Sequence, residues 1–355
     1  MRSGLRGRFL LFVASTALTL LSLEVVFRVV AWREDRRALE FALANPAPLP
    51  TDRSAWLREI LQISADDRIV YELRPAIEDV SFVGASLSTN ERGFRGPEVT
   101  TPKPRGWKRI VGIGDSTQFG WGVEREEAYL ELLARGLSSQ GGQHWDAVNT
   151  GVPGYNTVME VRTLREKALD LEPDLVVLGL VANDLQLPNF IRARSDVFAL
   201  NESFLLRVAR EGLDAGTAAA PKGLVDSPRE GDGGFGFESD PHRVPPQYED
   251  MVGWAPFEAA LDELAEMRDA HGFDVVAVSL WKVAPLDRML AACEARGFTT
   301  VLAEPAIGGY IRANDLEHYQ ESEMTVSLTD PHPSAITHGL IAEVLLDRIA
   351  TARGH

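Results

Sequence analysis

The chain has 355 residues, a formal net charge of −16 at pH 7, 45% hydrophobic residues and 25% charged residues. This length suits one large domain or two ordinary ones, and the composition excludes collagen, a long disordered acidic tail and a disulfide scaffold. The acidic balance argues against a nucleic-acid partner, because neutralising phosphates requires a surplus of lysine and arginine. Cys293 is the only cysteine and the seven histidines show no metal-ligand spacing, so the sequence predicts no intrachain disulfide and no metal site.

The N-terminus predicts a membrane anchor. Three arginines precede residues 9–32, an apolar stretch interrupted only by Glu24 and Arg28, which lie one helical turn apart and can pair. At ~1.5 Å per residue this stretch is long enough to cross a ~30 Å hydrocarbon core. The nearest small-x-small cleavage site, at 42–44, lies well beyond it. We therefore expect an uncleaved signal anchor at residues 1–37; a buried core helix and a cleaved signal peptide are the alternatives.

A signal anchor would export the rest of the chain, which predicts a single-pass protein of the cell membrane whose body lies on the extracytoplasmic side. Residues 1–37 carry a charge of +4 and the remaining chain −20. Prolines 46, 48 and 50 mark a linker, so we expect residues 38–108 to be a linker and an N-terminal extension.

From residue 109 onward strand-like and helix-like segments alternate. Apolar runs predict strands at 109–113, 147–149, 175–181 and 274–280. A capping box that begins at Thr157 and three-residue apolar spacing at 257–270 predict helices between them. This alternation is typical of a parallel sheet covered on both faces, with reactive residues in loops at the carboxyl ends of the strands.

Residues 214–247 break this pattern and are rich in glycine, proline and aspartate. We expect a mobile insertion here, either disordered or a lid over the site.

Three loops that follow predicted strands carry residues suited to acyl chemistry. Ser116 follows the first strand, where its hydroxyl can face the crevice while backbone N–H groups face a developing oxyanion. Gly154 follows the second strand and would let a backbone N–H approach a substrate oxygen. Asn183 follows the third and could donate from its amide. A turn or N-cap serine, a tight-turn glycine and an ordinary loop asparagine are the alternative interpretations.

A fourth segment near the C-terminus contains Asp330, His332 and Pro333. Pro333 suits the first position of a helix, which predicts that His332 lies at the helix entrance, where the helix dipole favours a neutral imidazole. Asp330 lies two residues earlier, so in an extended segment both side chains point the same way. The alternative is that Asp330 is a turn residue and His332 only caps the helix.

These four loops, in this order, resemble the SGNH (GDSL-like) hydrolase superfamily from about residue 109 to 346. The resemblance implies that Ser116 is the nucleophile, that His332 is the base, and that Gly154 and Asn183 are oxyanion donors together with the Ser116 N–H. It further implies a three-layer α/β/α flavodoxin-like fold, no metal or cofactor, and hydrolysis or transfer of acyl esters through an acyl-serine intermediate.

The aspartate departs from the family pattern. The family usually places it three residues before the histidine, where this chain has Thr329. Either Asp330 completes a triad through an altered loop path, or a backbone carbonyl orients His332 in a working dyad. The stretch 90–96 is similar to the one that precedes the catalytic domain in membrane-anchored bacterial members.

The resulting expectation is a membrane-anchored serine esterase with a catalytic domain at 109–355, acting on acyl esters of cell-envelope glycans or lipids, acetyl esters among them. An O-acyltransferase that uses a sugar hydroxyl as acceptor and a non-catalytic binding module are the alternatives. The oligomeric state has no signal in the sequence.

Overall fold

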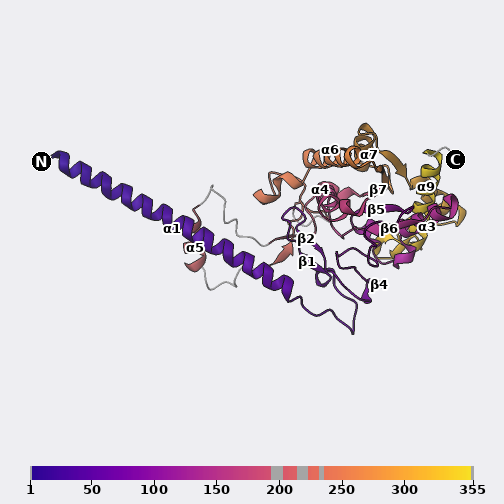
Figure 1. Ribbon diagram of the computed structural model, residues 1–355, viewed down its shortest axis with the longest axis horizontal. Helices are drawn as coiled ribbons and strands as arrows, with labels where there is room; N and C mark the ends of the chain where they lie inside the picture. The colour runs from indigo at the N-terminus through magenta and orange to yellow at the C-terminus, as the bar shows by residue number, and fades with distance from the viewer. Residues whose placement is uncertain (1, 193–202, 214–222, 232–235, 353–355) are drawn as a thin grey trace. The chain divides into compact units, whose positions relative to one another are not determined.

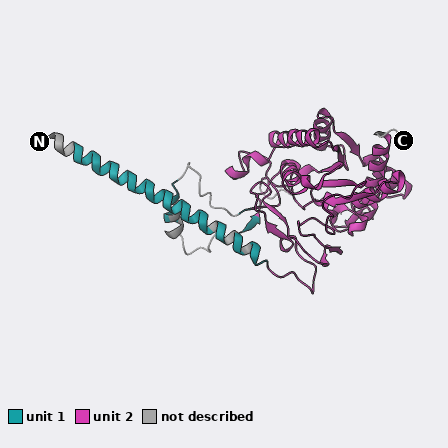
Figure 2. Cartoon of the chain, viewed as in Figure 1, with its two compact units in different colours: residues 1–46, 192–225 teal, residues 47–191, 226–355 magenta. Residues whose placement is uncertain are grey.

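The computed structural model describes the whole chain except residues 1, 193–202, 214–222, 232–235 and 353–355. The chain divides into two compact units, residues 1–46 with 192–225 and residues 47–191 with 226–355 (Figure 2). Parts of the expected insertion at 214–247 lie outside the described residues, so its mobility stays a prediction.

The smaller unit is dominated by α1 (Arg2–Ala44). Within it, Gly7–Glu34 is long and apolar enough to cross a membrane, with a mean hydropathy of 2.1 in a window that is not buried. A signal sequence shares this length and composition. The residues thus form a membrane-anchor or signal candidate.

Glu24 of α1 connects this helix to α5 (Phe204–Leu213). It pairs with Arg28 at 2.6 Å, as their spacing predicts. It also accepts hydrogen bonds from the backbone N–H groups of Phe204 at 2.6 Å and Leu205 at 3.0 Å. Glu24 therefore caps the first turn of α5, whose N–H groups have no partner within that helix.

The larger unit is built on a five-stranded parallel sheet with the order β11-β10-β7-β5-β6, of which Figure 1 labels β5, β6 and β7. Its strands are β5 (Lys108–Gly114), β6 (Trp145–Asn149), β7 (Leu175–Leu180), β10 (Asp274–Ser279) and β11 (Thr299–Leu302). The chain runs from β5 outward to β6 and then returns to the other side of β5 to form β7. The strand order thus reverses beside β5, which opens a crevice at the carboxyl ends of these strands.

Helices cover both faces of this sheet. One face carries α3 (Tyr129–Gly141), α8 (Glu304–Ala313) and α9 (Ala335–Ala352), and the other carries α4 (Thr157–Thr163), α6 (Trp254–His271) and α7 (Leu286–Ala295). Ile110, Leu175 and Val177 pack into the core under α3 and α9, and their chain neighbours point to the opposite face. Burial on both faces explains the nearly continuous apolar strands, and the expected three-layer α/β/α fold is confirmed.

Short elements complete the two units. The hairpins are β1 (Leu61–Ile63) with β2 (Tyr71–Leu73), β3 (Val80–Phe82) with β4 (Ala85–Leu87), and β12 (Thr325–Ser327) with β13 (Asp330–Pro333). The remaining short elements are α2 (Ser116–Phe119), β8 (Phe190–Arg192), β9 (Leu224–Asp226), η1 (Leu57–Glu59), η2 (Arg125–Glu127), η3 (Leu164–Ala168), η4 (Leu169–Leu171), η5 (Ala182–Leu185) and η6 (Pro246–Met251).

The start of α4 differs from the sequence prediction. Thr157 is the first helical residue and not the cap, so the capping box was placed one residue too late. Asn156 has extended backbone angles and its side chain accepts a hydrogen bond from the Met159 N–H at 3.2 Å. An asparagine in this geometry satisfies an N–H of the first turn, which is the property that defines an N-cap.

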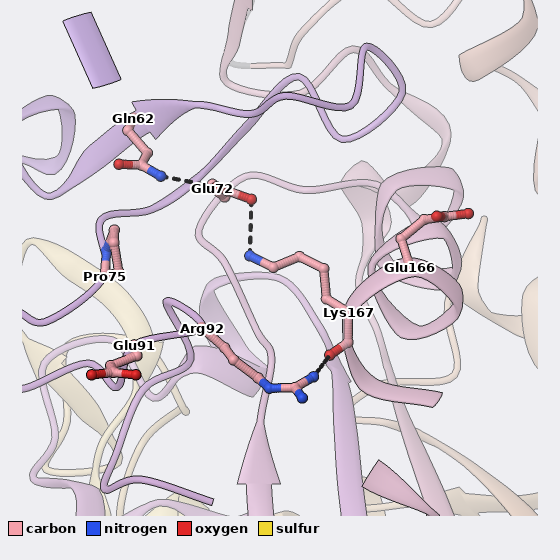
Figure 3. Close-up of a pocket in the computed structure, with 7 residues that line it drawn as sticks. All are labelled: Gln62, Glu72, Pro75, Glu91, Arg92, Glu166 and Lys167. Atoms are coloured by element: carbon pink, nitrogen blue, oxygen red, sulfur yellow. Dashed lines mark hydrogen bonds and ion pairs between the residues drawn. The ribbon is translucent and has the colours of Figure 1, made fainter. Parts of the chain in front are cut away.

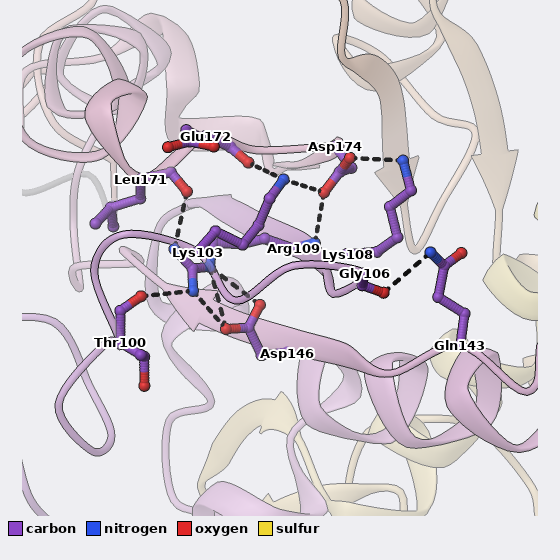
Figure 4. Close-up of polar contacts among 10 residues, drawn as sticks. All are labelled: Thr100, Lys103, Gly106, Lys108, Arg109, Gln143, Asp146, Leu171, Glu172 and Asp174. Carbon is purple, nitrogen blue, oxygen red and sulfur yellow. Dashed lines mark hydrogen bonds and ion pairs between the residues drawn. The ribbon is translucent and has the colours of Figure 1, made fainter.

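A polar cluster fixes the amino ends of the central strands (Figure 4). The fully buried Arg109 of β5 pairs with Asp146 of β6 at 2.7 Å and donates to the Leu171 carbonyl at 2.8 Å. Asp174, just before β7, accepts from Lys103 at 2.6 Å and from the Arg109 N–H at 2.8 Å. These contacts set the register of β5, β6 and β7, and leave their carboxyl ends free for the candidate site.

Candidate active site

Ser116 lies where β5 gives way to α2. Asp115 caps this short helix, accepting the Thr117 N–H at 2.9 Å, and Ser116 is its first residue. Ser116 is 9% exposed. Its Oγ lies 3.0 Å from His332 Nε2 and 3.0 Å from Asp115 Oδ2, so the one hydroxyl proton can be donated to either.

His332 lies on β13, not at a helix entrance, so that sequence prediction was wrong. Pro333 pairs with Thr325 in the β12–β13 hairpin and α9 begins only at Ala335. A short edge strand accommodates prolines because their missing N–H need not face another strand.

Asp330 and His332 point to the same side of β13, as an extended segment predicts. His332 Nδ1 lies 2.6 Å from Asp330 Oδ1, and the His332 N–H donates to the same oxygen at 3.1 Å. Ser116, His332 and Asp330 are thus joined in one hydrogen-bonded chain. Thr329 has no contact with the His332 ring among the contacts of the described residues.

Trp121 is a site residue that the sequence did not point to. Its Nε1–H donates to Asp330 Oδ2 at 2.8 Å. Its ring also stacks on the His332 ring, with centroids 4.9 Å apart and planes 23° apart. Both carboxylate oxygens of Asp330 are therefore occupied by donors. A lone tryptophan in a glycine-rich loop gives no pattern from which this contact could be predicted.

These contacts keep Asp330 ionised. Burial raises the pKa of its carboxyl, but the hydrogen bonds from His332 and Trp121 outweigh burial and lower that pKa below its ordinary value. An ionised carboxylate at this position holds the imidazole with a proton on Nδ1 and leaves Nε2 free to accept the serine proton.

The two other predicted loops meet the same crevice. Asn183 lies in η5, after β7, and its Nδ2 donates at 3.4 Å both to Asp115 Oδ2 and to the Tyr155 carbonyl. The side chain of Asn183 and the hydroxyl of Ser116 therefore share one oxygen of Asp115. Gly154 lies directly before Tyr155 with a φ of +79°, and a Cβ on it would lie 2.1 Å from the Asn189 side chain. Only glycine fits this turn.

Two further acids are buried behind the nucleophile. Glu160 of α4 and Asp184 of η5 are each 1% exposed. Burial first, and then the charges of neighbouring carboxylates, raise the pKa of both well above the ordinary range. Burial likewise raises the pKa of Asp115, against the opposing effect of the Thr117 N–H. Among the described residues, neither Glu160 carboxyl oxygen has a hydrogen-bond partner.

The part of the chain that the structure describes holds no group of three or more histidine, cysteine, aspartate or glutamate side chains arranged to hold a metal ion.

The model of the GDSL-like lipase/acylhydrolase family matches residues 113–288. The match includes Ser116, Gly154 and Asn183 and ends before β13. It therefore does not cover Asp330 and His332, which the fold places beside Ser116. No curated protein matches the chain.

Some solved structures are distantly similar to this chain. An α/β hydrolase from the metagenome of Lake Arreo in Spain is 17% identical, over 68% of this chain and 94% of its own, with a TM-score of 0.40. An acetylxylan esterase from Geobacillus stearothermophilus is 14% identical, over 68% and 94%, with a TM-score of 0.39. Neither similarity carries an argument about this chain, whose assignment rests on the family match and the site geometry. The chain carries a domain of the GDSL-like lipase/acylhydrolase family and is an ester-cleaving serine hydrolase.

Proposed function

We propose that this chain is a membrane-anchored esterase that hydrolyses acyl esters of cell-envelope glycans or lipids, acetyl esters among them, with Ser116, His332 and Asp330 as its catalytic triad. The observation that carries the proposal is the continuous contact from Ser116 Oγ to His332 Nε2 at 3.0 Å and from His332 Nδ1 to Asp330 Oδ1 at 2.6 Å. A nucleophile, a base and an orienting carboxylate within hydrogen-bond reach are the requirements of acyl transfer through serine.

The mechanism follows from this geometry. His332 Nε2 takes the hydroxyl proton as Ser116 Oγ bonds to the ester carbonyl carbon, and the carbonyl oxygen gains the negative charge. The N–H groups of Ser116 and Gly154 and the Asn183 amide are the proposed donors to this oxyanion. As the carbonyl re-forms, the alcohol leaves with the proton from His332. Water then attacks the acyl-serine by the same steps, and its proton passes through His332 back to Ser116 Oγ.

Anchoring and sidedness are part of the proposal. The exposed apolar segment Gly7–Glu34, preceded by arginines, supports a signal anchor, and the large domain that follows it supports export. A catalytic domain tethered on the extracytoplasmic side would meet esters of the envelope.

The test is covalent labelling of the full chain in detergent with a fluorophosphonate, beside turnover of short p-nitrophenyl esters. Ser116→Ala is expected to abolish labelling and to lower turnover by more than about 10³-fold, because the variant lacks the hydroxyl on which the acyl-enzyme would form. Ser139→Ala, at an exposed position on α3, is the matched control and should label like the wild type. Labelling that persists in Ser116→Ala would show that another residue is the nucleophile.

The same assay separates hydrolysis from acyl transfer, which would use the same residues with a sugar hydroxyl in place of water. Free acid as the product, unchanged when acylatable glycan is added, is expected for the esterase. Acyl groups recovered on the glycan would identify an acyltransferase.

A further inference from the structure

We propose that Arg95, in the N-terminal extension of the larger unit, is a positioning residue for the catalytic centre. It fixes the loop 119–123 and thereby holds Trp121 against Asp330 and His332. The inference rests on the proposed function, because it takes Asp330 and His332 as members of the working triad.

Arg95 is a buried cation that pairs with backbone and not with a carboxylate. It is 5% exposed, and among the described residues no carboxylate forms an ion pair with it. Its Nη1 donates to the carbonyls of Phe119 and Gly120, each at 2.7 Å, and its Nη2 donates to the Val123 carbonyl at 2.6 Å. Burial lowers the pKa of Arg95 to about 10, so the guanidinium remains charged at neutral pH. One side chain thus holds both ends of a five-residue loop.

The local structure explains why an arginine is needed. The helix α2 has only four residues, so the carbonyls at its C-terminal end have no partner in a following turn. Gly120 then turns the chain with a φ of +84°, and a Cβ on it would lie 2.7 Å from Arg95 Nη1. The guanidinium also lies over the Phe119 ring, 4.9 Å from its centroid. A planar fork reaches several carbonyls at once, which the single ammonium of lysine does not.

The loop held by Arg95 carries Trp121 between two supports. On one side Phe82 of β3 packs edge-on against the Trp121 ring at 5.0 Å. On the other side Trp121 stacks on His332, and a Cβ on Gly122 would lie 2.6 Å from Val326 of β12. The extension therefore packs the loop 119–123 against the β12–β13 hairpin, which carries Asp330 and His332. Displacing Trp121 would release one oxygen of Asp330 and one face of His332.

Within the larger unit, ion pairs hold the extension against η3 and η4. Glu72 of β2 pairs with Lys167 of η3 at 2.9 Å (Figure 3), and Arg92 pairs with Asp170 at 2.8 Å. A cavity of about 340 Å³ lies along this seam, and Arg92 and Lys167, the cations that line it, are both held in ion pairs. We attribute the cavity to packing between the extension and η3. Arg92 also supplies a control, because it belongs to the same segment but contacts no residue of the loop 119–123 among the described contacts.

The experiment compares Arg95→Lys with Arg92→Lys in the full chain, measuring kcat, KM and thermal unfolding. Arg95→Lys is expected to lower kcat at least about tenfold with KM within about twofold, since the loss falls on transition-state geometry and not on binding. Arg92→Lys should change both within about twofold.

A double-mutant cycle with Trp121→Phe tests the route. If Arg95 acts through Trp121, Arg95→Lys costs much less in the Trp121→Phe background than in the wild type. Full additivity, or equal losses in Arg92→Lys, would overturn the proposal. Arg95→Gln, which keeps one donor, is the second variant; if neither Arg95 variant folds, Arg95 serves the stability of the fold and the proposal is wrong. Loss of labelling in Ser116→Ala is independent of all these outcomes, so failure of the proposed function would be seen separately.

Discussion

The Ser116 hydroxyl lies between two acceptors at the same distance, His332 Nε2 and Asp115 Oδ2, both at 3.0 Å. The proposed mechanism assigns the proton transfer to His332, because Asp330 holds its ring by the other nitrogen. Asp115 also accepts from Asn183, so it aligns the nucleophile with one proposed oxyanion donor while the base is held from the other side. The orientation of the histidine by Asp330 then decides whether Ser116 is activated.

Asp330→Asn tests this orientation. The carboxamide can present its NH₂ group to Nδ1, which favours the tautomer with a proton on Nε2 and removes the acceptor for the serine proton. We expect kcat to fall about 10²–10⁴-fold with little change in KM. The measurement is kcat and KM for a short p-nitrophenyl ester.

Thr329→Ala is the control for that variant, because Thr329 occupies the position where the family usually has its aspartate. It should keep activity within about twofold. If Asp330→Asn also kept activity within twofold, His332 would work in a dyad oriented by a backbone group.

At the scale of the elements, the sequence predicted most of the strands whose position follows from a run of apolar residues. The strands β5, β7 and β10 are continuous apolar runs and were predicted to within about two residues. The loops bearing Ser116, Gly154 and Asn183 could be grouped because parallel strands bring their carboxyl ends to one edge. The edge strand β11 was missed, since it is only partly buried and its threonines break the apolar run.

Long-range contacts could not be predicted in this way. Pro333 suits a helix start and an edge strand equally well. It lies in a strand because it pairs with Thr325, which is distant from any local pattern around Pro333. Trp121 reaches Asp330 only because the loop after α2 and the hairpin β12–β13 meet in three dimensions. Local propensity carries no information about such a contact.

The packing of α4 against η5 gives a prediction about pH and stability. Glu160 has a folded-state pKa above its ordinary value of 4.5, so the native state keeps a proton that the unfolded state releases. Its contribution to stability is therefore present below about pH 4.5 and is lost as pH rises toward the folded-state pKa. Glu160→Gln cannot ionise. Its unfolding temperature should equal that of the wild type near pH 4.5 and exceed it at pH 8. The excess should be about 2–4 °C for each kcal/mol by which the free energies of unfolding differ.

Thermal unfolding at the two pH values measures this difference. Glu166→Gln removes the same charge from an exposed position of η3 and should leave the unfolding temperature within about 1 °C at both. A wild-type advantage at pH 8 would mean that the ionised Glu160 stabilises the fold.

At the scale of the whole molecule, the charge is divided unequally, with +4 in residues 1–37 and −20 in the rest. The basic residues 1–37 contain the apolar segment Gly7–Glu34, and the acidic remainder contains the candidate active site. A negative body is repelled by an anionic membrane surface, whereas flanking arginines hold a spanning helix in place.

We expect the full chain to sediment with membranes and to resist extraction by high salt and by carbonate. Replacing three apolar residues within Gly7–Glu34 by aspartate should move it to the soluble fraction, because each charge costs about 2.5–3.5 kcal/mol at the centre of a bilayer. Fractionation and immunoblotting measure the distribution. Replacement of three exposed residues of the larger unit by aspartate is the control, and release of the unaltered chain by carbonate would contradict an integral anchor.

The nucleophile and the base are separated by 216 residues, and the hairpin β12–β13 comes late in the chain. During synthesis the serine is made long before its histidine, so the growing polypeptide holds a nucleophile with nothing to deprotonate it. Hydrolytic power would arise only when the hairpin docks beside Trp121, after the 216 positions from Ser116 to His332 have been made. In a signal-anchored protein the N-terminus stays on the side of synthesis and the segments after the anchor cross in chain order, so Ser116 would cross before the hairpin and the triad would assemble only after the hairpin has followed.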